Sequence, residues 1–502
     1  GSGPWKKLDT LTFDGRDLDL FTAARHDRNP LHLSEDYARK TPYGERVVFG
    51  ILAALGAMGQ LSPRPGWELA NLRADFRNPL FGGVPYRVEL DESQTEEARI
   101  SISDGERLMS IVRLTFRPGA GRLEDGLHGR PVAARAEPAD RLLADIQEGL
   151  TVSGVYAPSA GPVAQLFHRW ELGDKGIARQ QLHGLLWSSY LVGMELPGKR
   201  ALFWSLDIHF EPGAFSSGSP IAYRAEIARS NLQLQFVELR ANLEIEGLPL
   251  ARAKMRAFVR QDSPALSAHA LEALLPASNR LLGKTAVVVG GSRGLGAAVV
   301  GALASQGCRV LGTYLRSADE AEHVRATSPE RIQMIQGDAS DELWCRNVLA
   351  AYDKLDILVC SAAPPIRPLG FSLSEVGRFR DFADRTLGLM AVPLATFVPV
   401  LSERAGWAVV ISSSYVSTKP AEWPHYVTAK SAVEGLVQWA AARYPQMSFL
   451  LARPPKLLTD QTNAPGARVD AMPVERAAAG IVRRLCLSRQ PSRGAPELLE
   501  LF

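Results

Sequence analysis

Two long apolar segments dominate the hydrophobic pattern of the N-terminal half. FGILAALGAMGQLSP begins at Phe49 and HGLLWSSYLVGMELP begins at His183, and the same offset of 134 residues pairs Phe76 with Phe210. Each segment has the character of a buried helix, and alternating strands follow it, such as LANLRADF and VPYRVEL after the first. This order predicts an α+β fold in which an antiparallel sheet wraps the helix, present in two packed copies.

The pattern also suggests where the domains end. We place the two copies at residues 4–120 and 139–261, joined by a Gly-, Pro- and Arg-rich linker at 118–138. A second linker, DSPALSAHALEALLPASNR, begins at Asp262. Residues 282–502 open with a buried apolar strand, a glycine turn and an apolar helix. That order predicts an α/β domain with a doubly wound parallel sheet.

Composition narrows the choice of partners. The 502 residues carry a net charge of +3, from 57 basic and 54 acidic side chains, so nothing favours nucleic acid or an anionic membrane as a partner. No apolar run approaches 18 residues, and the N-terminal GSGPWKKL has no signal-peptide pattern. We therefore expect a cytoplasmic protein. The cysteines, which lack metal-ligand spacing and predict a reduced, metal-free protein, are Cys308, Cys345, Cys360 and Cys486.

The glycine turn after the strand at 285–289 predicts a phosphate site. Glycines let the chain turn tightly and let a pyrophosphate approach the helix N-terminus, where free N–H groups favour negative charge. The next strand, RVLGTYLRS, ends without the acidic residue that would bind a ribose hydroxyl, and offers Arg316 instead, with Arg293 in the glycine turn. Two guanidinium groups suit a 2′-phosphate, which favours NADPH, although both could simply be solvated.

A second cluster lies further along the chain. Tyr426 and Lys430 are four residues apart in a predicted helix, so they share one face. A lysine beside a phenol should lower the phenol pKa, as a proton donor to a ketone oxygen requires. Ser413, at the end of the apolar strand WAVVISSS, could hydrogen-bond the same oxygen. The alternative is an exposed helical pair and a serine-rich strand end.

With the glycine turn, these residues resemble the short-chain dehydrogenase/reductase family over residues 282–502. The resemblance implies a Rossmann-type NADPH-binding ketoreductase domain, in which Ser413, Tyr426 and Lys430 are catalytic. Asp338 matches the family's adenine-contacting aspartate, and a homo-oligomer is expected from the family's habits. The residues that the resemblance assigns to the cofactor are Gly290, Ser292, Arg293, Gly294, Leu295, Gly296, Arg316, Asp338, Tyr426 and Lys430.

Some positions depart from the family pattern. Val289 replaces the leading threonine of the glycine motif, and Thr386 replaces a helix asparagine that often relays protons. The usual Asn-Asn-Ala-Gly reads Cys-Ser-Ala-Ala at residues 360–363. We expect these changes to affect the rate and the proton path more than the fold.

Acid/base chemistry is predicted just before the first apolar helix. Asp27 and His32 flank Asn29-Pro30 on a turn that enters a short helix, where a carboxylate and an imidazole can converge on one hydroxyl. The pair suits removal of a proton alpha to a carbonyl with protonation of the departing hydroxyl. The N–H of Gly50, at the start of the apolar helix, could stabilise a thioester oxyanion. Alternatively, Asp27 caps the turn and His32 is a packed core residue.

The segment resembles the MaoC-type (R)-specific enoyl hydratase/dehydratase branch of the hotdog fold, whose signature is Gly-Asp-x-Asn-Pro-x-His. Residues 27–32 keep all of it except the leading glycine, which is His26, and residues 37–39, 41–44 and Gly50 also match. Phe49 stands where the family has a histidine. The resemblance implies a double hotdog in which Asp27, His32 and Gly50 are catalytic.

The second copy should lack this chemistry. The 134-residue offset places Gly161 at the aspartate position and Leu166 at the histidine position, so we expect this copy to be structural or to shape the acyl tunnel. Three further histidines in this copy are predicted to be packing or surface residues: His168, His183 and His209.

A reductase and a dehydratase act in succession on one carbonyl compound, and their fusion raises the local concentration of the intermediate. The sequence therefore predicts NADPH-dependent reduction of a 3-oxoacyl thioester and its dehydration to a trans-2-enoyl thioester, as in fatty-acid or polyketide-type biosynthesis. Acyl carrier protein and coenzyme A both remain open as carriers. The alternatives are hydration with NAD-linked oxidation, as in beta-oxidation, and a reductase joined to a non-catalytic carrier-binding hotdog module.

Overall fold

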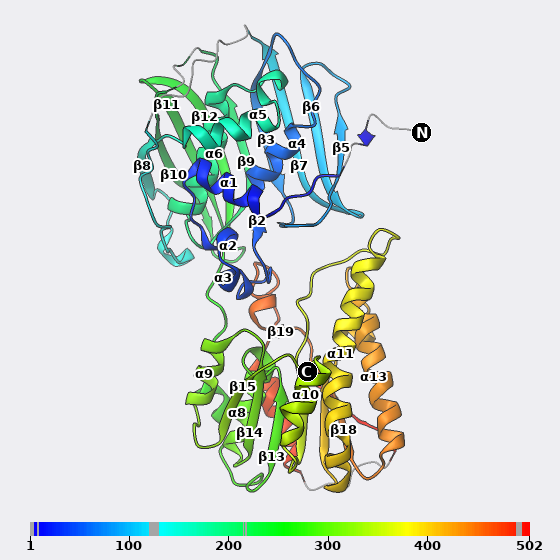
Figure 1. The fold of residues 1–502 in the computed structure, drawn as a ribbon. Helices are drawn as coiled ribbons and strands as arrows, with labels where there is room; N and C mark the ends of the chain where they lie inside the picture. The colour runs from blue at the N-terminus through cyan, green and yellow to red at the C-terminus, as the bar shows by residue number, and fades with distance from the viewer. Residues whose placement is uncertain (1–4, 8–9, 120–129, 214, 216–217, 488–493) are drawn as a thin grey trace. The chain divides into compact units, whose positions relative to one another are not determined.

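The computed structural model describes residues 5–7, 10–119, 130–213, 215, 218–487 and 494–502. The chain divides into two compact units, residues 1–262 and, apart from 464–466, residues 263–502 (Figure 1). Of the predicted linker at 118–138, residues 120–129 lie outside the described residues.

One continuous sheet forms the frame of the first unit. Its neighbouring strands are antiparallel, and among the described residues it has ten. In spatial order they are β1 (Lys6–Lys7), β5 (Arg87–Asp91), β6 (Glu97–Asp104), β7 (Arg107–Pro118), β3 (Trp67–Phe76), β9 (Ala201–Phe210), β12 (Leu248–Val259), β11 (Phe236–Ile245), β10 (Ile221–Asn231) and β8 (Thr151–Tyr156). The two copies meet where β3 pairs with β9, so they share one sheet.

The repeat predicted from the sequence appears as repeated packing. A Cβ on Gly50 would lie 2.9 Å from the ring of Phe76, and a Cβ on Gly184 would lie 3.1 Å from the ring of Phe210. In both copies, therefore, a helix glycine lets the apolar helix press against the phenylalanine that ends the following long strand. Buried side chains of both copies belong to a single hydrophobic core.

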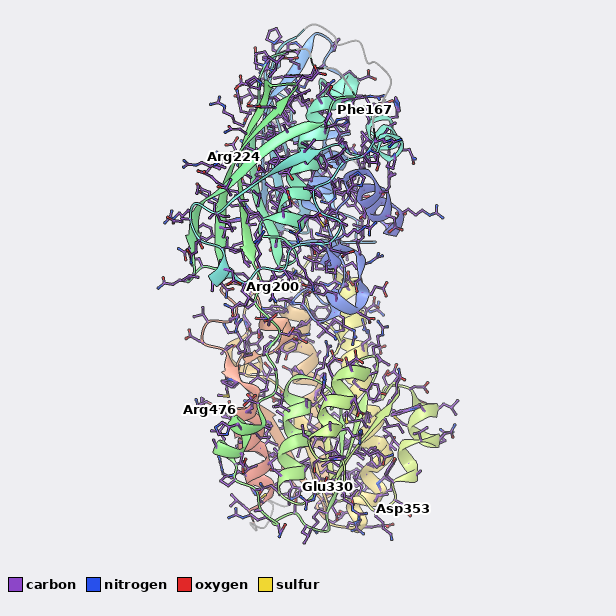
Figure 2. The ribbon with its side chains drawn as sticks, turned by 90° about the vertical axis from the view of Figure 1, so that its left-hand side faces the viewer. Phe167, Arg200, Arg224, Glu330, Asp353 and Arg476 are labelled. Carbon is purple, nitrogen blue, oxygen red and sulfur yellow. The ribbon has the colours of Figure 1, made fainter. Side chains whose placement is uncertain are left out.

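The helices of the first unit lie against one face of this sheet, as Figure 2 shows, with Phe167 on the helical side and Arg224 on the opposite side. They are α1 (Gly15–Arg25), α2 (Pro30–Leu33), α3 (Glu35–Arg39), α4 (Gly50–Met58), α5 (Ala160–Arg169) and α6 (Arg179–Tyr190), and a π-helical turn, Leu191–Glu195, continues α6. A small pairing of β2 (Val47–Val48) with β4 (Leu80–Phe81) lies beside the start of α4. Every residue of α4 after Gly50 is buried, as its uninterrupted apolar sequence predicts.

The second unit contains a parallel sheet, as predicted. Its strand order is β15 (Ile332–Gln336), β14 (Arg309–Tyr314), β13 (Thr285–Val289), β16 (Ile357–Cys360), β17 (Trp407–Ile411), β18 (Ser448–Arg453) and β21 (Glu497–Glu500). The chain first moves outward from β13 to β15 and then returns to the other side of β13 with β16. In open α/β sheets of this kind, ligands bind at the carboxyl ends of the strands beside such a reversal. Glu330 and Asp353, just before β15 and β16, both lie at the opposite end of this unit (Figure 2).

Both faces of the parallel sheet are covered. Within β13, Ala286 and Val288 belong to one buried core, while Val287 and Val289 belong to another on the opposite face. The first core includes α8 (Gly294–Ser305) and α14 (Val474–Leu485), and the second includes α11 (Val376–Glu403) and α13 (Pro424–Arg443). The remaining helices are α7 (Ala268–Leu274), α9 (Ala318–Ala326), α10 (Glu342–Asn347) and α12 (Tyr415–Thr418).

Two expectations require correction. The predicted linker from Asp262 contains helix α7, whose Leu271 is buried in the core formed with α8 and α14, because its apolar residues recur with a helical period. In addition, α11 is long and apolar enough to cross a membrane by length and composition, with a mean hydropathy of 1.5 over 18 residues. Its buried residues, including Phe397 and Leu401, pack in the core of the parallel-sheet unit, as those of a core helix do.

Candidate functional site

The turn that carries Asp27 is held in place by contacts with residues of both copies. Helix α1 ends at Arg25, and its C-cap residue, His26, has a φ of 62°, which turns the chain out of the helix. Asp27 is buried, and its Oδ1 accepts a 2.6 Å hydrogen bond from the N–H of Asn29. Asn29 caps α2, and its side-chain amide donates to the carbonyl oxygen of Gly193 at 3.0 Å. The signature asparagine therefore ties the turn to the π-helical turn of the second copy.

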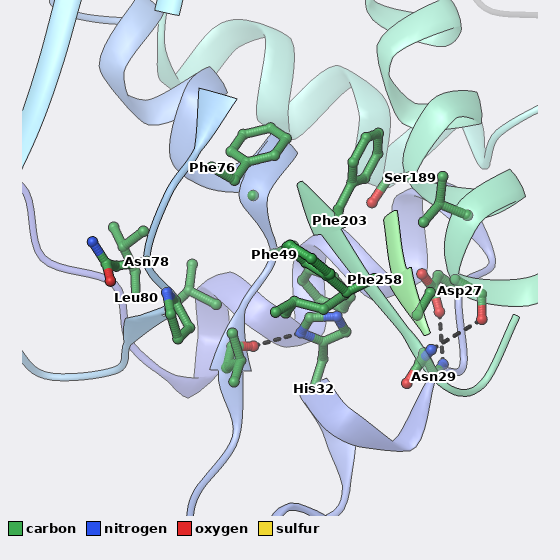
Figure 3. Close-up of a pocket in the computed structure, with 18 of the residues that line it drawn as sticks. Asp27, Asn29, His32, Phe49, Phe76, Asn78, Leu80, Ser189, Phe203 and Phe258 are labelled. Carbon is green, nitrogen blue, oxygen red and sulfur yellow. Dashed lines mark hydrogen bonds between the residues drawn. The ribbon is translucent and has the colours of Figure 1, made fainter. Parts of the chain in front are cut away.

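His32 lies on α2 with one ring nitrogen committed to the backbone. Its Nδ1 is 2.6 Å from the carbonyl oxygen of Val47, so Nδ1 carries the proton and donates it, leaving a lone pair on Nε2 (Figure 3). The imidazole lies against the ring of Phe49, with 3.8 Å between centroids. Burial and the charge of Arg25 lower the pKa of His32 to about 3, so the ring is neutral at pH 7. Neutral imidazole is the form that can accept a proton.

Arg25 is a member of this site that the sequence analysis missed. Its Nη2 lies 2.7 Å from Oδ2 of Asp27, and both side chains are buried. Burial lowers the pKa of Arg25 to about 10, which still leaves it charged at pH 7. Burial raises the pKa of Asp27, and the adjacent guanidinium opposes that rise. No motif marks Arg25, and only its position two residues before Asp27 could have drawn attention to it.

Asp27, His32 and Gly50 line one cavity of about 80 Å³. Gly50 is the first residue of α4, so its N–H has no acceptor within the helix. The cavity lies at the positive end of the helix dipole, as the predicted oxyanion site requires. Figure 3 shows His32 and Asp27 near one another with aromatic rings above them. The second copy contributes the lining residues Ser189, Val192, Gly193, Ala201, Leu202, Phe203 and Phe258.

The second copy has no equivalent pair in the described part of this segment. Gly161 is exposed on α5, and Leu166 is buried in the common core. Helix α6 begins at Arg179, so Gly184 lies inside the helix and offers no free N–H. His183 is buried, while His168 and His209 are exposed. These positions fit the packing and surface roles that the sequence predicts.

The glycine turn of the second unit has the geometry of a phosphate site. Gly290 and Gly294 have φ of 78° and 55°, which side-chain-bearing residues rarely adopt. A Cβ on Gly296 would lie 1.8 Å from the carbonyl oxygen of Gly290, so only glycine fits. Helix α8 begins at Gly294, and the side chain of its N-cap residue, Arg293, makes no capping hydrogen bond. Ser292 and Leu295 lie within the same strand-to-helix segment.

Ser413, Tyr426 and Lys430 come together at the carboxyl end of β17. Tyr426 and Lys430 lie on α13, with the Nζ of Lys430 5.7 Å from the centroid of the phenol ring. That Nζ donates a 3.0 Å hydrogen bond to the carbonyl oxygen of Ile411 on β17. Ser413 lies directly beyond this strand and hydrogen-bonds the Tyr426 hydroxyl.

The expected pKa shift of Tyr426 is wrong for the protein as it stands. Burial raises the pKa of Tyr426 above its ordinary value, and the hydrogen bond from Ser413 is the main opposing influence. Burial also lowers the pKa of Lys430 to about 8. The sequence shows that the two side chains share a helix face, but it does not show how deeply both are buried.

The remaining predicted cofactor residues differ in their surroundings. Arg316 is exposed two residues after β14. Arg293 lies 3.4 Å from the carboxylate of Asp460, so it is paired. Asp338 follows β15 and accepts hydrogen bonds from the N–H and hydroxyl of Ser340. Thr386 is buried in α11, and its hydroxyl has no hydrogen-bond partner among the described residues.

Comparison with known proteins shows the family of the N-terminal region and that of the C-terminal region. Residues 284–463 match the sequence model of the short chain dehydrogenase family. The chain is 32% identical over 128 residues to a 3-hydroxybutyryl-CoA dehydratase of Methylorubrum extorquens, covering 21% of this chain and 82% of that protein. The N-terminal region belongs to the MaoC-like hydratase/dehydratase family. The C-terminal region carries a short-chain dehydrogenase/reductase domain.

Two further relatives match this reductase domain. A 3-oxoacyl-[acyl-carrier-protein] reductase FabG of Staphylococcus epidermidis is 26% identical over 194 residues, which cover 36% of this chain and 79% of that protein. The oxidoreductase YhxC of Bacillus subtilis is 34% identical over 93 residues, which cover 17% of this chain. The chain spans only 33% of the length of YhxC.

Proposed function

We propose that the protein is a bifunctional enzyme that reduces a 3-oxoacyl thioester with NADPH and then dehydrates the resulting 3-hydroxyacyl thioester to a trans-2-enoyl thioester. The observation that carries the dehydratase half is the cavity shared by Asp27, His32 and the N-terminus of α4. The reductase half rests on the glycine turn together with Ser413, Tyr426 and Lys430. In this proposal the first unit is a double hotdog whose second copy completes the cavity walls.

Dehydration needs a base for the α proton and an acid for the departing hydroxyl. Neutral His32 has its Nε2 lone pair available and accepts the proton from the α carbon. Asp27, in its protonated form, gives its proton to the 3-hydroxyl, the C–O bond breaks, and water leaves as the C=C bond forms. The N–H of Gly50 stabilises the negative charge on the thioester oxygen in between. Return of the proton from His32 to Asp27, through water, resets the site.

The reductase residues fit a nicotinamide dinucleotide phosphate. Gly290 and Gly296 leave no room for a side chain at the turn, and the uncapped start of α8 favours a diphosphate. The bound cofactor supplies the hydride. Tyr426 donates a proton to the ketone oxygen, while Ser413 orients that oxygen and Lys430, in its charged form, stabilises the phenolate that remains.

The relatives support a thioester substrate. The M. extorquens protein is named for a coenzyme A thioester, and the S. epidermidis protein is named for an acyl-carrier-protein thioester. Both carriers present the acyl group as the same kind of thioester. We propose the reductive direction because no acidic residue ends β14 where NAD binding would call for one, and Arg316 is exposed there.

A mass-spectrometric assay tests both halves. The protein is incubated with a 3-oxoacyl group on coenzyme A or on acyl carrier protein, with either NADPH or NADH. We expect 3-hydroxyacyl and then enoyl product with NADPH. Formation of enoyl product only from supplied hydroxyacyl thioester would remove the reductase assignment. An NADH preference would favour the opposite direction, and turnover by the reductase alone would leave the first unit as a carrier-binding module.

A further inference from the structure

The side chain of Arg25 is fully buried, and its contacts are all with other residues of the protein. One nitrogen, Nη2, lies 2.7 Å from Oδ2 of Asp27, and the other, Nη1, donates to the hydroxyl of Ser189. The guanidinium also lies over the rings of Phe49 and Phe21, 3.6 Å and 4.4 Å from their centroids. A carboxylate, a hydroxyl and two aromatic rings therefore surround one fully buried cation.

The contact with Ser189 connects the two copies. Arg25 ends α1 of the first copy, while Ser189 lies on α6 of the second copy, 164 residues later. Ser189 also lines the cavity, whereas Arg25 is behind Asp27 and outside the cavity lining. Arg25 can therefore affect the reaction only through the groups beside it, which are Asp27 and, through its charge, His32.

A buried cation next to a carboxyl group changes what that group can do. Without compensation, burial strongly disfavours the ionised carboxylate, so the group keeps its proton. A guanidinium within hydrogen-bonding distance stabilises the ionised form and makes the acid stronger. The contact also fixes Oδ2, while the Asn29 N–H fixes Oδ1.

We propose that Arg25 is a positioning residue that orients Asp27 and makes it a stronger acid, and that Ser189 of the second copy holds Arg25 in place. The second copy, which lacks an acid/base pair of its own, thus completes the dehydratase site by supplying Ser189. This inference rests on the proposed dehydratase function. The other titratable or charged groups that face Asp27 or its partners are His32, Tyr156 on β8 and Arg260 after β12.

Dehydration of (R)-3-hydroxybutyryl-CoA across a pH series tests the proposal. For Arg25→Met we expect kcat to fall roughly tenfold or more, because Asp27 becomes a weaker acid, with little change in KM, because Arg25 does not line the cavity. The descending limb of the pH profile should move to higher pH, because Asp27 holds its proton more tightly. Arg25→Lys keeps the charge, so its kcat and the pH of its descending limb should both lie closer to those of the unsubstituted protein. Ser189→Ala should show a smaller change of the same kind.

Two matched controls separate this role from packing. Arg64 is a second buried arginine of the same unit, paired with Glu92 at 2.9 Å and lying 4.4 Å from the centroid of the Phe116 ring, and it does not line the cavity. Arg64→Met should leave the pH limb unmoved. Ser188→Ala removes a buried hydroxyl that donates to the Leu185 carbonyl oxygen. This variant should also leave the descending pH limb unmoved.

Each outcome bears on a different claim. An unshifted limb in Arg25→Met overturns the inference, as does a change confined to KM. If Arg25→Met does not fold, Ser189→Ala and Arg25→Lys decide, and an unaltered kcat and limb in both overturn it. Absence of dehydration by the unsubstituted protein contradicts the proposed function instead.

Discussion

Gly193 and Asp27 are in contact across the two copies. A Cβ on Gly193 would lie 2.3 Å from Oδ2 of Asp27, so the carboxylate occupies the space that a side chain would fill. Gly193 belongs to the π-helical turn that continues α6. Such turns occur often at functional sites, and this one also supplies the carbonyl that accepts from Asn29. The second copy has lost the acid/base pair but still shapes the position of the first copy's carboxylate.

Gly193→Ala should therefore damage dehydration. The new methyl group displaces the Asp27 carboxyl group, and misplacement of a general acid by about 1 Å can cost roughly 10²-fold in rate. The measurement is dehydration of a supplied 3-hydroxyacyl thioester, with NADPH oxidation in the same protein as the reference. Gly161→Ala is the matched control, because a Cβ there meets nothing within 4 Å. Equal dehydration rates in the two variants would contradict the argument.

Tyr426→Phe should separate the two activities. The phenylalanine keeps the ring but removes the hydroxyl that hydrogen-bonds Ser413 and donates the proton. We expect NADPH oxidation to fall by about 10²- to 10⁴-fold while a supplied 3-hydroxyacyl thioester is still dehydrated. Loss of both activities in a folded variant would mean that the sites are not independent.

The reductase should lose activity as the pH rises through about 8. Burial lowers the pKa of Lys430 to about 8, while that of Tyr426 is raised, so lysine is the group of the pair that loses its proton first. A neutral lysine no longer stabilises a phenolate, so kcat/KM should decline above that pH. Lys430→Arg keeps its charge over this range and should move the decline upward. A profile of the unsubstituted enzyme that stays flat to pH 10 would exclude this role for Lys430.

Local features were predictable from the sequence, and contacts between distant segments were not. Asn29-Pro30 predicted the start of α2, and the helical spacing of Tyr426 and Lys430 predicted their common face. Arg25, Ser189 and Gly193 carry no motif, because their importance comes from a contact that spans 164 residues. Helix α7 was missed for a related reason: its 7 residues are too few to form a stable helix alone, and burial of Leu271 against α8 and α14 stabilises it.

Arg316→Ala should raise the Michaelis constant for NADPH much more than that for NADH. A charge-assisted hydrogen bond to a 2′-phosphate is worth roughly 1.5 to 3 kcal/mol, and NADH has no such group. Arg293→Ala should act in the same direction, with an additional contribution from its lost pairing with Asp460. Arg309→Ala, at the opposite end of β14, is the control. If NADH is the better cofactor of the unsubstituted enzyme, the reductive direction loses its support.

The asymmetry of the repeat gives the last prediction. Asp27→Asn and His32→Ala should each stop dehydration, so that NADPH reduction of a 3-oxoacyl thioester accumulates the 3-hydroxyacyl product. The reduction in rate should be about 10²- to 10⁴-fold, as for other general acid/base groups. A polar substitution at Leu166, which is buried where the second copy would have its histidine, should instead lower stability or acyl affinity through packing.

The product distribution of His32→Ala decides whether His32 is catalytic or only structural. His32 touches Phe49 and the Val47 carbonyl, so a purely structural histidine would also cost stability when removed. Replacement of a catalytic histidine, in a folded protein whose reductase still works, would also change which product accumulates. Enoyl product at the unsubstituted rate would return His32 to the role of a packed core residue and place the chemistry elsewhere.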